Sequence, residues 1–492
     1  MKPAEKDNVF SVNSATIFVL SAINQLIPEG KYVQQTIKIK HALVFVYALI
    51  VLLPIEHANA LGLIEAYEAA LANDSVYRAA QHDNEAGQQY KIIGRANLLP
   101  NISASYAYNR NNSDISSTGN GLSRDETRNY KSENGAIQLR QPLINLESWA
   151  RYRQGELQTA LSDKQFAARK QELIQRFFGL YAQANYAEDV LVLSVAQRDA
   201  FKIQAQANKQ MAVRGEGTKT ALIESQAKLS LSEAQIIESQ DNVTNARNAL
   251  ANMIAKEQFA LDALTDTFKV QVLEQPDFNA WKNIALENNP EITAQQESVA
   301  LAYQEIRRNR AGHTPRLDAV AIISRSKSDS TATFNQDIDN KSIGVQLNIP
   351  IYSGGSVNAL TSQAEANYKK AQDDLDTKTN EVLLDLRKQY NTVLSSTLKI
   401  DALKESVASA ELLVTATKKS LIGGVRTNLD VLDARKQLFE AKRDLSQARY
   451  NYLVAYINLK KAAGTLNIAD LEKIAPNFIP QQRVAIGNDE AH

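Results

Sequence analysis

The chain has 492 residues and contains no cysteine. This absence excludes disulfide bonds, thiol catalysis, cysteine metal ligands and a lipid-modified N-terminal cysteine. The five histidines do not form a His-Glu-x-x-His pattern, and neither a phosphate-binding glycine loop nor Gly-x-Ser-x-Gly occurs. We therefore expect no catalytic residue, no cofactor and no metal centre, and we predict that the protein is not an enzyme.

Long apolar runs are missing beyond residue 60, and charge of neither sign is in excess. Lysine plus arginine and aspartate plus glutamate each number 55, so the sequence lacks a basic footprint for nucleic acid. No run after Ala60 approaches the roughly 20 apolar residues of a membrane-spanning helix. Any entry of the mature chain into a membrane must therefore use strands.

Residues 1–60 are predicted to form a leader. Lys31, Lys38 and Lys40 precede an apolar core at residues 42–53, and a small-x-small site ends at Ala60. These three features are typical of a secretory signal peptide, here cleaved after Ala60. The alternative is an uncleaved anchor, although the core is shorter than a spanning helix. The true start codon upstream of the signal is left open.

The chain contains one pattern twice, because residues 71–102 match residues 286–317 at a constant spacing. The identical pairs are Asn73/Asn288, Ala79/Ala294, Arg95/Arg310, Ala96/Ala311 and Pro100/Pro315. A period of about 200 residues is too long for a solenoid unit. It predicts a duplicated half-molecule.

Each half is predicted to hold a helix, two strands, a very long helix, a tight turn and a second long helix. The first repeat is residues 61–270, with strands at about 101–110 and 132–142 and long helices at about 147–211 and 218–255. The second is residues 271–469, with strands at about 316–325 and 342–351 and long helices at about 356–420 and 427–463. Polar links at residues 111–131 and 326–341 are predicted to be solvated loops. Residues 470–492 are predicted to be an irregular tail.

The predicted strands alternate apolar and polar residues, as in the runs that begin at Ile102 and Ile343. This period of two indicates strands with one apolar face, which soluble sheets also have. Four strands cannot close a membrane barrel, because the smallest barrels use about eight. If the strands enter a membrane, several chains must pool them.

The long helices carry two seams with a seven-residue period. In the last helix the large seam is Val431, Leu438, Leu445, Tyr452 and Leu459, and the small seam is Ala434, Ala441, Ala448, Ala455 and Ala462. In the first half the large seam is Leu222, Leu229, Ile236, Val243 and Leu250, and the small seam is Ser225, Ser232, Ser239, Ala246 and Met253. Such seams let helices approach closely and supercoil. On the heptads alone, an elongated helical hairpin without a transport role is the alternative.

Glycine and threonine mark the turn between the long helices in each half. The turn glycines are Gly215, Gly217, Gly423 and Gly424, and the threonines that follow are Thr218 and Thr427. The glycines are predicted to end the first helix through a left-handed C-cap. The threonines are predicted to N-cap the next helix.

Asp430 lies three residues after Thr427, the place of the carboxylate in a capping box, so helix capping is its simplest interpretation. Asp433 follows near the same face of the helix. The first half has Ala221 and Glu224 at the equivalent positions. This asymmetry between the halves favours a role beyond capping.

The C-terminal block carries a family resemblance. It comprises Gly424-Val-Arg426-Thr427-Asn-Leu-Asp430-Val-Leu-Asp433-Ala, then Ala448-Arg-Tyr450-Asn451-Tyr452-Leu453, then Gly464-Thr465-Leu466. With the duplicated layout, this block resembles the TolC family of outer membrane efflux proteins over about residues 61–471. The resemblance implies a mainly α fold with membrane β-structure. Three chains would form a twelve-stranded outer-membrane β-barrel that continues into a long periplasmic coiled-coil α-barrel.

The same resemblance implies a function and its partners. The protein would be a passive exit duct in the outer membrane of a Gram-negative cell, with helices extending into the periplasm. It would serve type I protein secretion or multidrug efflux, together with a periplasmic adaptor and an inner-membrane ABC or proton-driven transporter. The sequence selects neither the exported substrate nor the transporter. A periplasmic coiled-coil structural or adaptor protein is the alternative.

Finally, the resemblance implies a gate at the periplasmic tips. Asp430 and Asp433 would ring the entrance with six carboxylates in a trimer, and Arg426 would help to hold it shut. A ring of this kind attracts blocking cations, and mutual repulsion raises the pKa of some of its carboxyl groups.

This chain departs from the family's gate at two positions. Leu421 stands where the family has a tyrosine, and Ala221 stands where it has an aspartate. We therefore expect Arg426 to pair with Glu216 or Glu224 instead, or the resting gate to be looser.

Overall fold

The computed structural model describes residues 60–119, 122–271, 273–328 and 336–479. The predicted leader, including its apolar core at residues 42–53, lies outside the described residues, as does the end of the predicted tail after residue 479. All elements below belong to one structural unit that begins at Ala60.

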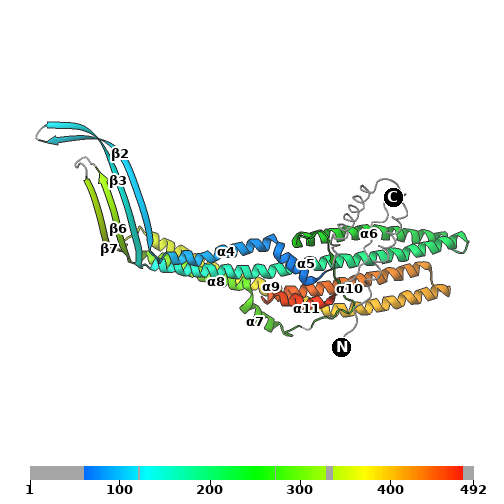
Figure 1. The fold of residues 1–492 in the computed structure, drawn as a ribbon. Helices are drawn as coiled ribbons and strands as arrows, with labels where there is room; N and C mark the ends of the chain where they lie inside the picture. The colour runs from blue at the N-terminus through cyan, green and yellow to red at the C-terminus, as the bar shows by residue number, and fades with distance from the viewer. Residues whose placement is uncertain (1–59, 120–121, 272, 329–335, 480–492) are drawn as a thin grey trace, which may run out of the picture. The chain divides into compact units, whose positions relative to one another are not determined.

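The same order of elements occurs twice (Figure 1). The first set is α3 (Leu63–Asn73), α4 (Ser75–Ala96), β2 (Asn101–Gly119), β3 (Leu122–Ile144), α5 (Leu146–Val213) and α6 (Lys219–Ile254). The second set is α7 (Phe278–Asn288), α8 (Pro290–Arg310), β6 (Arg316–Ser328), β7 (Gln336–Asn348), α9 (Ser356–Ile422) and α10 (Asn428–Ala462). The short elements are β1 (Ala60–Leu61), β4 (Ala260–Leu261), β5 (Ala263–Leu264), η1 (Ala311–His313), α11 (Ile468–Ile474), η2 (Ala475–Asn477) and β8 (Phe478–Ile479).

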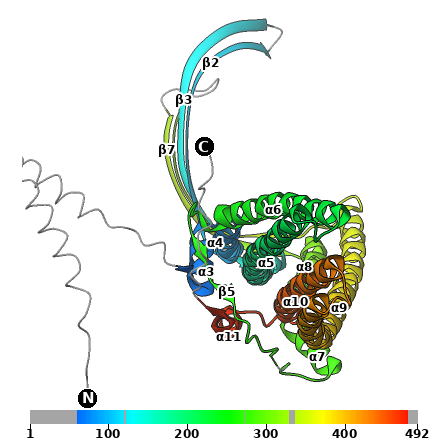
Figure 2. The same ribbon diagram turned by 90° about the vertical axis from the view of Figure 1, so that its right-hand side faces the viewer.

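The two longest helices organise the unit. α5 has 68 residues and α9 has 67, so each is about 100 Å long at 1.5 Å per residue. Along the half nearer the strands, contacts run in the order α4, α5, α8, α9; along the other half they run α6, α5, α10, α9 (Figure 2). Within the described residues, no helix combines the length and apolarity of a membrane-crossing segment.

The seams predicted from the heptads lie inside this helical layer. On α10 the small residues Ala434, Ala441 and Ala448 are all buried, and so are Val431 and Tyr452 of the large seam. On α6 the first three members of the small seam are serines, and each serine hydroxyl donates to a carbonyl of its own helix. These bonds are Ser225 to Leu222 O (2.9 Å), Ser232 to Leu229 O (2.7 Å) and Ser239 to Gln235 O (2.8 Å). A buried hydroxyl satisfied in this way lets small polar residues replace alanine at a close contact.

The crossing of α4 and α5 depends on glycine. A Cβ built on Gly155 would lie 2.4 Å from the carbonyl oxygen of Tyr90 and 3.1 Å from the Cα of Gly94. Both neighbours are backbone atoms, which cannot move aside without shifting a whole helix. The short side chain at this point therefore sets how closely the two helices pack.

The four long strands form one antiparallel sheet in the order β2-β3-β6-β7. One row across it places Ile102 opposite Leu139, Leu139 opposite Ala321, and Ala321 opposite Ile343. Ile102 is 67% exposed and Ile343 89% exposed, so this apolar face is uncovered in the single chain. The other face is more polar and carries an Arg140–Asp318 ion pair with Nε–Oδ2 at 2.9 Å.

The sheet has two open edges. Among the described residues, β2 pairs only with β3, and β7 pairs only with β6. The outer edges of β2 and β7 therefore present unpaired backbone N–H and C=O groups, which act as a template for a further strand. The helical layer likewise ends at α4 and α6 on one side and at α9 on the other.

The prediction of solvated loops at residues 111–131 and 326–341 is wrong for most of their length. β2 continues to Gly119 and β3 begins at Leu122, whereas the first predicted strand ends near residue 110 and the second begins near residue 132. Polar cross-strand bonds line this extension, including Thr127 Oγ1 to Asp114 Oδ1 at 2.6 Å and Asn111 Nδ2 to Ser132 Oγ at 3.2 Å. A ladder exposed on both faces needs no apolar residues, so its strands lack the period-two signal.

The second hairpin and the long helices differ less from their predicted bounds. β6 runs three residues beyond residue 325, and β7 covers residues 336–348 where the sequence gives about 342–351. Each of the four long helices begins and ends within two residues of its predicted limits.

The main core lies midway along the long helices, where α3, α7 and α11 pack against them. Its centre is aromatic: the Tyr181 ring lies tilted against Phe177 and edge-on to Phe478, with ring centroids 5.9 Å and 5.3 Å apart. The prediction of an irregular tail from residue 470 is wrong as far as residue 479. This part of the chain contains α11 and β8, and its Leu471 is fully buried. Buried Lys460 holds this segment through Glu274 (2.6 Å) and Asp470 (3.5 Å).

We predict that Gly155→Ala destabilises the protein by about 1–3 kcal/mol, the range for overpacking a tight contact. The added methyl would meet the Tyr90 carbonyl of α4. Gly179→Ala is the matched control on the same helix, because no atom lies within 4 Å of its Cβ position. That control should be neutral or stabilising by about 0.5–1 kcal/mol. Denaturant unfolding of both variants measures the difference, and equal destabilisation would refute the close-contact argument.

Candidate functional site at the helix tips

The two tip turns join α5 to α6 and α9 to α10. Gly215 (φ +74°) and Gly424 (φ +73°) are left-handed, as predicted for C-cap glycines. Gly423 differs, because it has a φ of −76° and requires no glycine-specific conformation. Gly217 is needed for space, since its Cβ would lie 2.9 Å from the Cβ of Met211.

Threonine starts the helix after each turn, and both predicted N-caps are confirmed. Thr218 Oγ1 accepts from the Ala221 amide at 3.2 Å, and Thr427 Oγ1 accepts from the Asp430 amide at 3.3 Å. Asp430 Oδ2 in turn accepts from the amide and the hydroxyl of Thr427, both at 2.8 Å. The second turn thus has a complete capping box, whereas the first has only a cap.

The capping box sets the ionisation of Asp430. The backbone and side-chain hydrogen bonds from Thr427 lower the pKa of this carboxyl group below its ordinary value, and the charge of Arg426 acts in the same direction. Within one chain this shift is opposite to the rise expected from neighbouring carboxylates. Donors aimed at the ionised form outweigh the slight desolvation of an exposed group.

Arg426 does not reach the partners expected for it. Its Nη1 lies 3.4 Å from Oδ1 of Asp430, in the same turn of the chain. The structure therefore pairs Arg426 with Asp430 rather than with Glu216 or Glu224. This contact is local, so it does not connect the two hairpins of the tip.

Asp433 is paired across the two hairpins, a contact that the sequence does not predict. Its Oδ1 accepts from Nζ of Lys228, a residue of α6. Glu224 lies one helical turn before Lys228 and is half-buried. In the repeat alignment Lys228 corresponds to the uncharged Gln437 of the second half, which does not indicate Asp433 as its partner.

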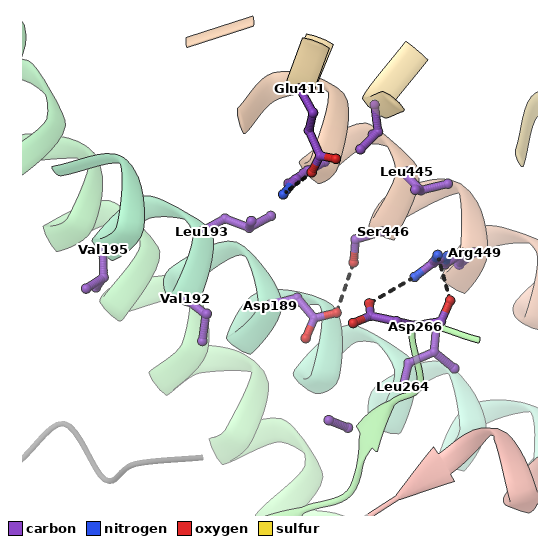
Figure 3. Close-up of a pocket in the computed structure, with 13 residues that line it drawn as sticks. Asp189, Val192, Leu193, Val195, Leu264, Asp266, Glu411, Leu445, Ser446 and Arg449 are labelled. Carbon is purple, nitrogen blue, oxygen red and sulfur yellow. Dashed lines mark hydrogen bonds and ion pairs between the residues drawn. The ribbon is translucent and has the colours of Figure 1, made fainter. Parts of the chain in front are cut away.

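A pocket of about 670 Å³ lies farther from the tip, between α5, α9, α10 and the segment that contains β5 (Figure 3). Its charged groups are joined to one another. The contacts are Ser446 Oγ to Asp189 Oδ2 at 3.0 Å, Lys442 Nζ to Glu411 Oε1 at 2.8 Å, and Arg449 Nη2 to the Asp266 carbonyl at 3.3 Å. The first contact joins α10 to α5, the second joins α10 to α9, and the third ties the segment after β5 to α10. The described residues also contain no cluster of three or more His, Asp or Glu that could hold a metal ion.

The long helices follow directly on an antiparallel sheet whose apolar face is uncovered, and proteins of this architecture include outer-membrane channels. The sequence profile of the outer membrane efflux protein family matches this chain at residues 66–256 and 281–465, one match for each repeat. The chain belongs to this family, as its C-terminal block indicated. It is an outer-membrane channel and not an enzyme, which sets aside the adaptor interpretation.

Curated relatives are similar over nearly their whole length. The chain is 39% identical to the alkaline protease secretion protein AprF of Pseudomonas aeruginosa, covering 92% of this chain and 94% of the relative. It is 38% identical to the proteases secretion protein PrtF of Dickeya chrysanthemi, covering 86% and 92%. It is 28% identical to the outer membrane protein TolC of Escherichia coli, covering 87% and 90%.

Solved structures agree on the fold. The outer-membrane channel OprN superposes with a TM-score of 0.71 at 14% identity, over 82% of this chain and 90% of that one. The outer membrane protein VceC of Vibrio cholerae gives 0.70 at 17% identity, over 82% and 96%. The predicted TolC-like fold is confirmed.

We predict that Thr427→Val raises the pKa of Asp430 toward the ordinary 3.8, because the hydroxyl donor is lost while the amide donor remains. In the native protein the lowered pKa means that the capping box stabilises the tip above pH 3.8. That stabilisation is lost as the pH falls through the folded-state pKa. A ¹³C NMR titration of the aspartate carboxyl groups measures the shift.

Thr218→Val is the matched control for this titration. It removes a hydroxyl that caps α6 without contacting Asp430. The pKa of Asp430 should stay low in this variant. An identical pKa for Asp430 in the native protein and in Thr427→Val would contradict the capping-box account.

Proposed function

We propose that this chain is the outer-membrane exit duct of a type I protein secretion system, with a protease as the exported class of protein. The observation that carries the proposal is the pattern of similarity. The two relatives near 40% identity are both named as protease secretion proteins, whereas TolC stands at 28% over a similar length. Relatives named for solvent or toluene efflux match only 36% of the chain.

We propose further that the duct is a homotrimer. Open strand edges are not tolerated in lipid, because no water is present to satisfy the backbone groups. Pairing β7 of one copy with β2 of the next would close a twelve-stranded barrel from three chains. Its apolar face, through Ile102 and Ile343, would meet lipid, and the face with Arg140 and Asp318 would line the lumen.

The long helices suit a periplasmic conduit in the same assembly. In each copy the layer ends at α9 on one side and at α4 and α6 on the other, so neighbouring copies can continue it into a closed tube. The tips then form the periplasmic entrance, where a periplasmic adaptor and an inner-membrane ABC or proton-driven transporter would dock. Asp430, Asp433, Arg426 and Glu224 are proposed to control passage there, on turns shaped by Gly215, Gly217, Gly423 and Gly424.

The proposed trimer can be tested by the mass of the assembled particle. Native mass spectrometry of the mature chain in mild detergent should give three chains per particle, because closure pairs the edges of β2 and β7 and three four-stranded sheets supply the proposed twelve strands. A folded monomer in that detergent would contradict the assembly.

The proposed role in secretion predicts that this chain restores protease export to a strain that lacks its own duct. A strain that retains its protease transporter and adaptor but lacks its own outer-membrane duct should regain extracellular protease when it expresses this chain. An empty vector is the control, and drug susceptibility is measured in the same strain. Restored drug resistance with the protease still retained inside the cell would replace protein secretion by drug efflux.

A further inference from the structure

Three polar contacts join the α5–α6 hairpin to α10 near the tip. They are Lys228 Nζ to Asp433 Oδ1, Gln204 Nε2 to Asn428 Oδ1 at 2.7 Å, and Arg435 Nη1 to the Ala200 carbonyl oxygen at 2.9 Å. None of these contacts involves Arg426, whose charged partner is within its own turn. The connection between the hairpins is therefore made by residues other than the arginine that the family resemblance singled out.

Of the three, only the Lys228–Asp433 contact is an ion pair. Lys228 is well enclosed, with 25% of its side chain exposed, and Asp433 is 58% exposed. Because water screens the exposed carboxylate, a pair of this kind stabilises the contact between the hairpins only weakly. Pairs of this exposure shift an equilibrium by up to about fivefold.

The pair also changes the charge at the entrance. While Lys228 holds Asp433, the positive and negative charges offset each other, and Asp430 has Arg426 as its own neighbour. In this state the ring of carboxylates is largely compensated. If the Lys228 contact breaks, Asp433 is left uncompensated and the mouth becomes more negative.

We propose that Lys228 is the latch of the tip. It holds the α5–α6 hairpin to α10 through Asp433 and masks the charge of that carboxylate until the hairpins separate. Breaking this one contact would therefore both open the tip and increase its selectivity for cations. This inference rests on the proposed function of the chain as a duct gated at its tips.

The test compares two variants that break the same pair but leave opposite charges. Lys228→Met and Asp433→Asn should each raise the resting single-channel conductance of the purified full-length assembly in a planar bilayer, by about twofold to fivefold. Their ion selectivity should move in opposite directions. Lys228→Met frees Asp433 and increases selectivity for K⁺ over Cl⁻, whereas Asp433→Asn frees Lys228 and decreases it.

The reciprocal double variant, Lys228→Asp with Asp433→Lys, should return the conductance to the native level because the pair is restored with reversed polarity. Lys436→Met is the matched control: its lysine lies nearby but pairs with Glu440 of its own helix at 3.6 Å, so conductance should not change. Circular dichroism and native mass establish that each variant is folded and assembled.

Three results would overturn the latch. If native protein conducts and Lys228→Met does not differ from it, the duct stands and the latch is wrong. Failure of the double variant to restore low conductance, with both single variants elevated, would show that each side chain acts separately. If folded native protein forms no channel at all, the proposed function fails and the latch fails with it.

Discussion

The unpaired edges of β2 and β7 are the constraint on which the rest of this structure depends. A four-stranded sheet with an exposed apolar face is unstable in water, and its open backbone is unstable in lipid. The homotrimer that we propose removes both difficulties, because neighbouring copies would pair the open edges of β2 and β7. Because α5 follows β3 after a single residue, the helices would take part in the same proposed closed arrangement.

Helices of about 100 Å can pack in a single layer because the backbones of neighbouring helices approach one another closely. A helix in such a layer has neighbours only on two sides, so those contacts must bring the backbones near. Gly155 against Gly94, the alanines of α10 and the internally bonded serines of α6 each remove side-chain volume from a contact. The aromatic core midway along the helices supplies conventional burial where α3, α7 and α11 add a second layer.

An element can be predicted from the sequence when the residues that determine it lie close together along the chain. Helix limits and N-caps could be predicted, because heptads, glycines and Thr427 act within a few residues of one another. The extension of β2 beyond residue 110 could not, because an exposed polar ladder has no apolar alternation. The Lys228–Asp433 pair was missed for another reason: its members lie 205 residues apart, and no periodic pattern relates them.

The duplication of the chain explains how the tip can hold an ion pair between its two hairpins. The two hairpins share a backbone plan, with a left-handed glycine and an N-cap threonine in each. Identical sequences would also place like charges at equivalent positions, and such charges repel when the hairpins meet. Here Lys228 stands where the other half has Gln437, and Ala221 stands where it has Asp430. The seven-residue seams occur in both halves, so the two halves pack in the same way. The charged residues at the tip differ between the halves, and this difference allows Lys228 of one hairpin to attract Asp433 of the other.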